Sequence, residues 1–289
     1  MKKRFFIYAV LMIAFVFCLY CDVGFAAMRN LLDDFRSAIS RRDLKAAQTA
    51  INEGINASDG VKSLLLYNPS DKDDDFFVPL VKALAKKGSF KDVSLYVGSG
   101  TSGLERGGNY RLGMVISSNK VIDALLEGGA DPDRPRRLRD RSTGTEFDSH
   151  TTLLFETLEQ LREQSVIRED DKLLERVKIL AKHDASLKNV GFVGGIFVSI
   201  MGIGGEPSPT EAINFFLKGR GLDKVGNLTD ENLSSILVVM KVLHDAGAGT
   251  GEANDYLKKL REQYRNIPDA LKYLDKIEES FKSSSWWSW

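Results

Sequence analysis

Three segments of this chain repeat one pattern, and that repetition constrains the fold more than any other feature. Each has a helical stretch, a short polar break, a second helical stretch and an ending that contains Gly or Ala. Apolar residues recur three and four positions apart, as in amphipathic helices. The segments are Phe35 to Asn56, Val78 to Ser102 and Tyr110 to Asp133; Gly54, Gly100 and Gly129 follow the second helical stretches, where a left-handed cap favours glycine. The repetition predicts stacked helical pairs.

The ending of the third segment resembles the ankyrin repeat. Leu125 to Asp133 reads LLEGGADPD, which is similar to that family's second-helix ending followed by its Gly-Ala-Asp turn. Val78 to Ala83 resembles the Thr-Pro-Leu-His-x-Ala opening, with Val replacing both Thr and His. Thr151 to Glu156 opens a further candidate unit, whose second helix is expected over Leu174 to Leu180 before an ending at residues 183–185. Another ending lies at residues 239–248.

The spacing departs from the family's pattern. Ankyrin units run for about 33 residues, whereas Gly54, Gly100 and Gly129 are 46 and 29 residues apart. Insertions are therefore expected at Ser70 to Asp75, Arg134 to Asp148 and Arg162 to Asp171. The fold class expected is all-α, a helical-hairpin solenoid of ankyrin-like repeats with irregular insertions. A generic helical-hairpin solenoid is the alternative.

The rest of the chain completes this predicted organisation. Residues 28–250 form the repeat domain, in which the Gly-rich apolar segment Asn189 to Gly205 is expected as a buried helix. Residues 251–282 are charged and periodic and predict two capping helices separated at Pro268, because an open array needs a polar-faced end unit. Residues 283–289 form a Trp-rich tail.

The first 27 residues have the composition of a secretory signal peptide. Lys2, Lys3 and Arg4 precede an apolar run from Phe5 to Cys21, and small residues follow. Cleavage is expected after Ala26 or Ala27, which places the protein in the periplasm or outside the cell. The alternatives are an uncleaved N-terminal membrane anchor and, less in keeping with the bulky residues before Cys18 and Cys21, a lipoprotein.

The composition of the mature chain excludes several kinds of chemistry. Removing Lys2, Lys3, Arg4 and Asp22 from 40 basic and 40 acidic residues leaves 37 and 39, a formal charge of −2. This balance provides no general attraction to nucleic acid. Both cysteines of the chain lie in the signal peptide, so the mature protein has no disulfide, thiol nucleophile or Cys-ligated metal.

No motif for catalysis or cofactor binding occurs. The zinc-helix, nucleophile-elbow and phosphate-loop patterns are absent from the sequence. Asp71 to Asp75 is acidic but lacks the Gly and distal Glu of a calcium loop, so it is interpreted as a surface loop. His183 and His244 follow predicted helices, where they interact favourably with the helix dipole and the free carbonyls. No enzyme activity, cofactor or metal is expected.

Two segments are candidates for binding a partner. Five arginines follow the third unit where ankyrin proteins have a protruding hairpin loop: Arg134, Arg136, Arg137, Arg139 and Arg141. Guanidinium groups pair with carboxylate or phosphate, so this loop is interpreted either as a site for an acidic partner or as a solvated insertion. The tail contains Trp286, Trp287 and Trp289, which suit a membrane or protein interface.

The sequence therefore predicts an exported, non-enzymatic binding protein. The ankyrin resemblance implies that the stacked array holds another protein on its concave face and loops. Two alternatives are a helical enzyme or small-ligand domain and a secreted effector that acts on a host protein.

Overall fold

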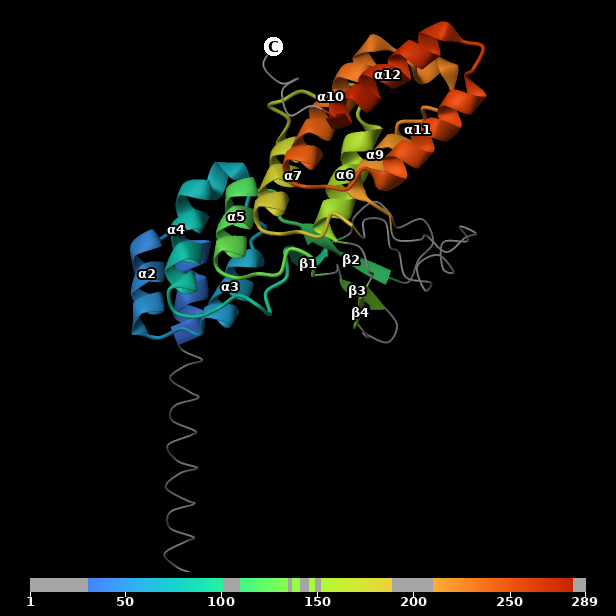
Figure 1. The fold of residues 1–289 in the computed structure, drawn as a ribbon. Coiled ribbons are helices and arrows are strands. Elements are labelled where there is room, and N and C mark those ends of the chain that lie inside the picture. The colour runs from blue at the N-terminus through green and yellow to red at the C-terminus, as the bar shows by residue number, and fades with distance from the viewer. Residues whose placement is uncertain are drawn as a thin grey trace, which may run out of the picture.

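The computed structural model describes residues 31–100, 110–134, 137–140, 146–148, 152–188 and 210–282. Helices dominate these ranges, which confirms the predicted helical character, and one small sheet accompanies them (Figure 1). None of the helices described there is long and apolar enough to cross a membrane. The predicted signal peptide, the Gly-rich segment (189–205) and the Trp tail lie outside the described residues.

Most helices begin at a polar residue whose side chain caps the first turn. Asp43, Asn56, Ser118, Thr152, Asp171 and Thr229 each accept a hydrogen bond from a backbone N–H of the helix that follows. The helices are 31–40, α2 (Leu44–Glu53), α3 (Ala57–Leu65), η1 (Asp71–Asp73), α4 (Asp74–Ala85), α5 (Asn119–Glu127), α6 (Leu153–Glu163), α7 (Lys172–Lys182), α9 (Ala212–Gly219), η2 (Val225–Asn227), α10 (Asp230–Asp245), α11 (Gly251–Gln263) and α12 (Pro268–Lys282).

The helices are arranged in pairs, and one member of each pair lies in a continuous row. α2, α4, α5, α7, α10 and α12 contact one another in that order (Figure 1). α6, α9 and α11 also contact one another in turn, and they pair with α7, α10 and α12. The loop that joins the two helices of a pair therefore crosses from one row to the other.

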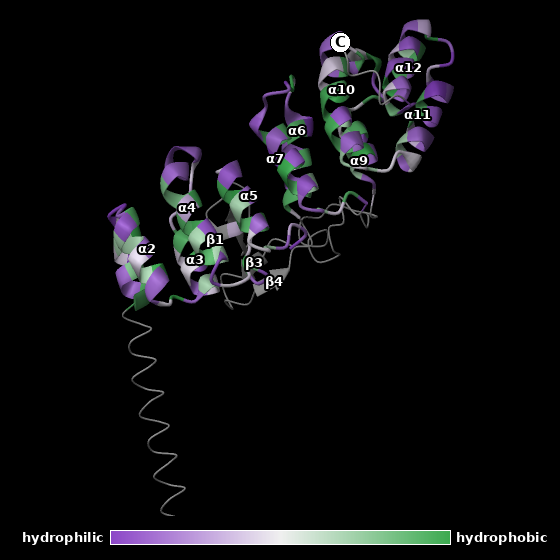
Figure 2. Ribbon diagram, turned by 60° about the vertical axis from the view of Figure 1, so that its left-hand side comes forward, coloured by the Kyte–Doolittle hydropathy of each residue, from purple (hydrophilic) through white to green (hydrophobic). Residues whose placement is uncertain are grey.

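The apolar core follows the helical rows through the described part of the chain. Phe35, Phe77, Phe90 and Phe216 are fully buried, and the core continues through Leu274 and Ile277 in α12. The buried residues of α10 recur at helical spacing, with Ile236, Val239, Met240 and Leu243 among them. Figure 2 shows the resulting alternation of hydrophobic and hydrophilic residues along the helices.

A four-stranded antiparallel sheet departs from the all-α expectation. Its strands are β1 (Tyr96–Gly100), β2 (Tyr110–Val115), β3 (Arg137–Asp140) and β4 (Glu146–Asp148), in that spatial order. Tyr96 pairs with Val115, and Leu112 pairs with Leu138. The sequence of β2 explains the difference, because Tyr110 and Val115 favour extended structure and Gly113 weakens a helix.

The predicted second and third units are displaced from the observed pairs. Val78 to Ala83, expected to open a unit, lies within α4, which occupies the same row as α2 and α5. The second helix expected before Gly100 is absent, because Gly100 ends strand β1. Residues 110–115 likewise form strand β2 in place of a first helix.

Other boundaries agree with the sequence prediction. Gly54 and Gly129 have φ values of 119° and 91°, so both occupy the left-handed conformation expected after α2 and α5. α6 and α7 form the pair predicted between Thr151 and Ala185. The C-terminal pair is also present, and Pro268 is the first residue of α12.

Candidate binding surface

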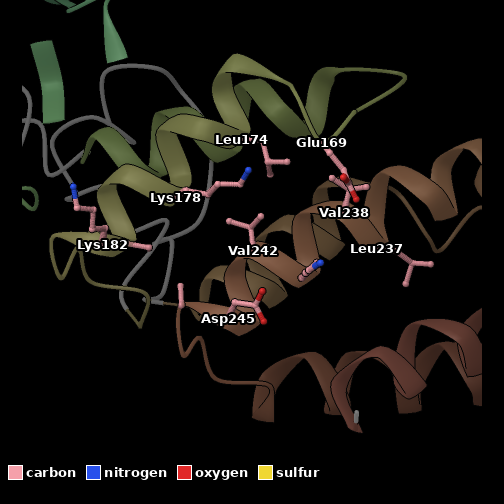
Figure 3. A pocket seen from close by; sticks show the side chains of 11 residues that line it. Glu169, Leu174, Lys178, Lys182, Leu237, Val238, Val242 and Asp245 are labelled. Carbon is pink, nitrogen blue, oxygen red and sulfur yellow. The ribbon is translucent and has the colours of Figure 1, made fainter. Parts of the chain in front are cut away.

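Helix α7 lies between two open grooves. The first groove, between α7 and α10, has a volume of about 610 Å³ (Figure 3). The second, between η1, α5 and α7, has a volume of about 590 Å³. Lys178 and Lys182 of α7 line both grooves, so the two form adjoining parts of one surface.

The α7–α10 groove has an apolar floor because α10 carries two apolar stripes. One stripe is buried in the core through Ile236, Val239 and Leu243. Leu237, Val238 and Val242 form the other, which is only partly buried and lines the groove. A helix that is apolar on two faces needs a second packing partner or leaves a surface to which another molecule can bind.

Charged side chains surround this floor. Glu169, Lys178, Lys182, Lys241 and Asp245 line the groove (Figure 3). Lys178 forms an ion pair with Glu175 at 3.5 Å, and Lys182 forms one with Asp123 at 3.0 Å. The groove therefore combines an apolar centre with a polar rim, the arrangement found in protein interfaces.

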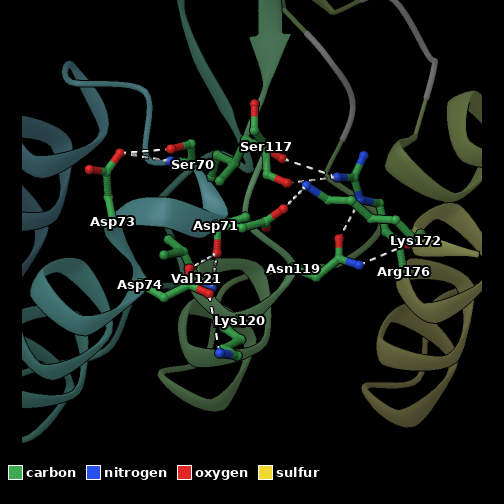
Figure 4. Close-up of polar contacts among 12 residues, drawn as sticks. Ser70, Asp71, Asp73, Asp74, Ser117, Asn119, Lys120, Val121, Lys172 and Arg176 are labelled. Carbon is green, nitrogen blue, oxygen red and sulfur yellow. Dashed lines mark hydrogen bonds and ion pairs between the residues drawn. The ribbon is translucent and has the colours of Figure 1, made fainter. Parts of the chain in front are cut away.

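The second groove is lined by ion pairs that join separate helical pairs. Lys172 of α7 pairs with Asp71 of η1, and Lys120 of α5 pairs with Asp74 of α4 at 3.4 Å (Figure 4). Asp74 also accepts a hydrogen bond from Ser118. Because these charges already compensate one another, this groove is less suited than the first to recognise a charged partner.

Buried arginines hold neighbouring pairs together beneath this surface. Arg176 of α7 is 5% exposed and donates hydrogen bonds to Asn119 Oδ1 at 3.0 Å and to the carbonyls of Ile116 and Ser117 (Figure 4). Burial lowers the pKa of the Arg176 guanidinium, and the nearby carboxylates of Asp71 and Glu156 oppose that change.

Arg220 repeats this arrangement one pair later. It donates to Asn232 Oδ1 at 2.7 Å and to the carbonyls of Arg162 and Gln164 at 3.1 and 2.5 Å. Each arginine thus donates to a side-chain amide near the start of a neighbouring helix and to backbone carbonyls, which for Arg176 immediately precede that helix and for Arg220 lie at the end of α6. Both side chains therefore have a structural role, because these contacts satisfy buried polar groups.

His183 lies in a cluster that joins the ends of α5 and α7. Its Nε2 is 2.7 Å from Asp123 Oδ1, and Lys182 Nζ is 3.0 Å from the same oxygen. Burial raises the pKa of Asp123, but hydrogen bonds from His183 and Lys182 outweigh that effect, and its pKa lies below the ordinary value. The sequence placed His183 at a helix end but did not find Asp123 as its partner.

The predicted partner-binding arginines are only partly within the described residues. Arg134 donates to the carbonyl of Lys91 at 2.9 Å and lies 3.9 Å from Asp92, so it joins two turns of the chain. Arg137 and Arg139 are in strand β3. Arg136, Arg141, Trp286, Trp287 and Trp289 lie outside the described residues.

The acidic segment Asp71 to Asp75 is helical rather than a loop, because it forms η1 and the first turn of α4. Asp73 pairs with Arg42 at 2.9 Å, and its carboxylate accepts a hydrogen bond from the Ser70 hydroxyl at 2.8 Å. Across the described part of the chain, no three His, Cys, Asp or Glu side chains converge as metal ligands.

The α7–α10 groove was not predicted from the sequence. The sequence signal for it is a second apolar stripe on α10, formed by Leu237, Val238 and Val242. A helix that packs on the core through one face does not need these additional apolar residues. Comparisons with known proteins give no counterpart: no family model, curated protein or solved structure matches the chain.

Proposed function

We propose that this protein is an exported, non-enzymatic protein–protein interaction module built on ankyrin-like repeats. The observation that carries the proposal is the α7–α10 groove, an open apolar surface on a row of stacked helices. Repeat arrays of this kind bind partners on surfaces that run across neighbouring units. Export is inferred from the charged start, apolar run and small residues of the first 27 positions.

Two further features favour binding over catalysis. Burial raises the pKa of Asp133 and Glu159, yet neither carboxylate lines either groove. Asp123, which contacts His183, is ionised in an ion-pair cluster with Lys182. An active site would instead move such pKa values toward the working pH, whereas the pKa of Asp123, which lines the second groove, is lowered and that of Lys182, which lines both grooves, is raised, so each stays charged.

A matched pair of variants tests this proposal. Val238→Asp places a charge on the groove floor, whereas Val225→Asp places the same charge on η2, at a residue that is 51% exposed and outside the groove. The wild-type protein, purified from the exported fraction, is used to capture partners from the native envelope fraction. We expect Val238→Asp to lose the captured protein and Val225→Asp to retain it, with equal helical circular dichroism in both.

The opposite results would contradict the proposal. Equal capture by both variants would remove the groove as the site of binding. Turnover of a substrate by the purified protein, abolished by Val238→Asp, would assign the groove to an enzyme instead.

A further inference from the structure

The α7–α10 groove contains two carboxylates that the rest of the described structure leaves uncompensated. Glu169 precedes α7 and Asp245 ends α10, and both line the groove (Figure 3). Neither has a hydrogen-bond or ion-pair partner among the described residues. Asp245 is also at a helix C-terminus, where the helix dipole disfavours negative charge.

The cations of the groove differ from these carboxylates because they are already engaged. Lys178 pairs with Glu175, and Lys182 pairs with Asp123. Lys241 also has an interaction within the protein. His244, the other basic residue near Asp245, is in the last turn of α10 and does not line the groove. The charged groups of the groove that remain available to pair with a partner are therefore the two carboxylates.

The carboxylates lie on either side of the apolar floor. Glu169 and Val238 both line the groove and overlap in the view of Figure 3, and Asp245 follows Val238 by seven residues on α10. At the helical rise, these seven residues span about 10 Å, which is close to two helical turns. A helix placed along the groove would present two side chains at this separation if they were seven residues apart in its sequence.

We propose that the groove binds a helical segment of the partner protein that has an apolar face flanked by two basic residues, seven positions apart. The apolar face covers Leu237, Val238 and Val242, and the two cations face Glu169 and Asp245. This is the helix-in-groove mode of recognition, in which charges at the ends set register and direction. The inference rests on the proposed binding function and names the chemistry of its partner.

Three synthetic peptides test the inference directly. All have the same Leu- and Ala-rich face over about 14 residues; the first has Lys at two positions seven apart beside that face. The second has Glu at those positions, and the third has both lysines on the opposite face. Binding is measured by fluorescence anisotropy with the protein purified from the exported fraction. We expect the first peptide to bind at least about tenfold more tightly than the other two.

Variants of the groove identify where the peptide binds. Glu169→Gln and Asp245→Asn should each weaken binding of the first peptide about two- to fivefold, the range for an exposed ion pair. Asp255→Asn, at an exposed position of α11 outside the groove, serves as the matched control and should change nothing. Glu169→Lys combined with Asp245→Lys should reverse the preference toward the Glu peptide.

The inference is overturned if the Lys and Glu peptides bind equally, if the third peptide matches the first, or if no peptide binds. These failures are distinct from failure of the proposed function. If Val238→Asp abolishes capture of the native partner while the peptides fail, the groove binds a protein of different chemistry. If Val238→Asp also leaves capture unchanged, the proposed function fails as well.

Discussion

Individual charged residues in this protein mainly connect one helical pair to the next. Arg176 and Arg220 are buried, and each bonds to a side-chain amide and to backbone carbonyls of another segment. Asp133, in the turn after α5, accepts hydrogen bonds from the backbone N–H of Ser186 at 2.8 and 3.0 Å. Such contacts fix how neighbouring units are oriented, because a buried polar group tolerates few alternative positions.

Asp123 and Asp133 should have opposite effects on the pH dependence of stability. Hydrogen bonds from His183 and Lys182 overcome the effect of burial and lower the pKa of Asp123, so its stabilising contribution is present above pH 3.8 and is lost as the pH falls through the folded-state pKa. Burial raises the pKa of Asp133, so its contribution is present below pH 3.8 and is lost as the pH rises through the folded-state value.

Urea unfolding between about pH 3 and pH 7 measures this difference. For Asp123→Asn, the free energy of unfolding lost relative to wild type should shrink below pH 3.8. For Asp133→Asn, the wild-type advantage should shrink as the pH rises above 3.8. If the free energy of unfolding lost relative to wild type changed in the same direction with pH for both variants, one of the two assigned environments would be wrong.

At the scale of elements, close turns determine how the helices meet the sheet-bearing segment. Gly128 ends α5 and accepts a hydrogen bond through its carbonyl from the N–H of Phe90 at 2.9 Å. The ring of Phe90 is fully buried against this glycine, and a Cβ added there would lie 2.2 Å from Phe90 Cδ2. The absence of a side chain thus permits the turn before β1 to pack on α5.

Gly128→Ala should therefore destabilise the fold, although φ at this position is an ordinary −79°. We expect a loss of about 1–3 kcal/mol in the free energy of unfolding, the usual cost of overpacking a core. Gly226→Ala is the control, because a Cβ at that position meets no atom within 4 Å. Equal effects in urea titrations of the two variants would contradict the close contact with Phe90.

The sequence predicted elements well where local patterns determine them. Gly54, Gly129 and Pro268 lie at helix ends as predicted, and the unit expected to open at Thr151 begins with α6. The sheet was missed because its pairing depends on partners that are distant in the chain, as in Leu112 with Leu138. The groove was missed for a related reason: only the placement of α7 beside α10 shows which apolar residues stay uncovered.

At the scale of the whole molecule, the helices form an extended series in which each pair contacts its neighbours. The row from α2 to α12 places the N-terminal and C-terminal pairs at opposite ends (Figure 1). In a solenoid, as proposed for this chain, stability is the sum of local terms and of contacts between adjacent units. A defect at one end should then weaken that end most.

Leu274→Ala provides such a defect, because Leu274 of α12 is fully buried. Its removal should cost about 2–5 kcal/mol locally. Hydrogen–deuterium exchange should show lost amide protection in α10, α11 and α12, with α2, α3 and α4 retaining most of theirs. A uniform loss of protection across all helices would favour one cooperative globular unit and contradict the solenoid.

The most direct test of the account is site-specific photo-crosslinking in the native exported compartment. A photoreactive residue replaces Val238 on the groove floor in one protein and Val225 on η2 in another. We predict that position 238 crosslinks to a discrete partner protein and that the crosslink falls in a segment with an apolar face and basic residues. Position 225 should give no such product. Equal crosslinking from both positions, or none from position 238 while a partner is still captured, would contradict binding in the α7–α10 groove.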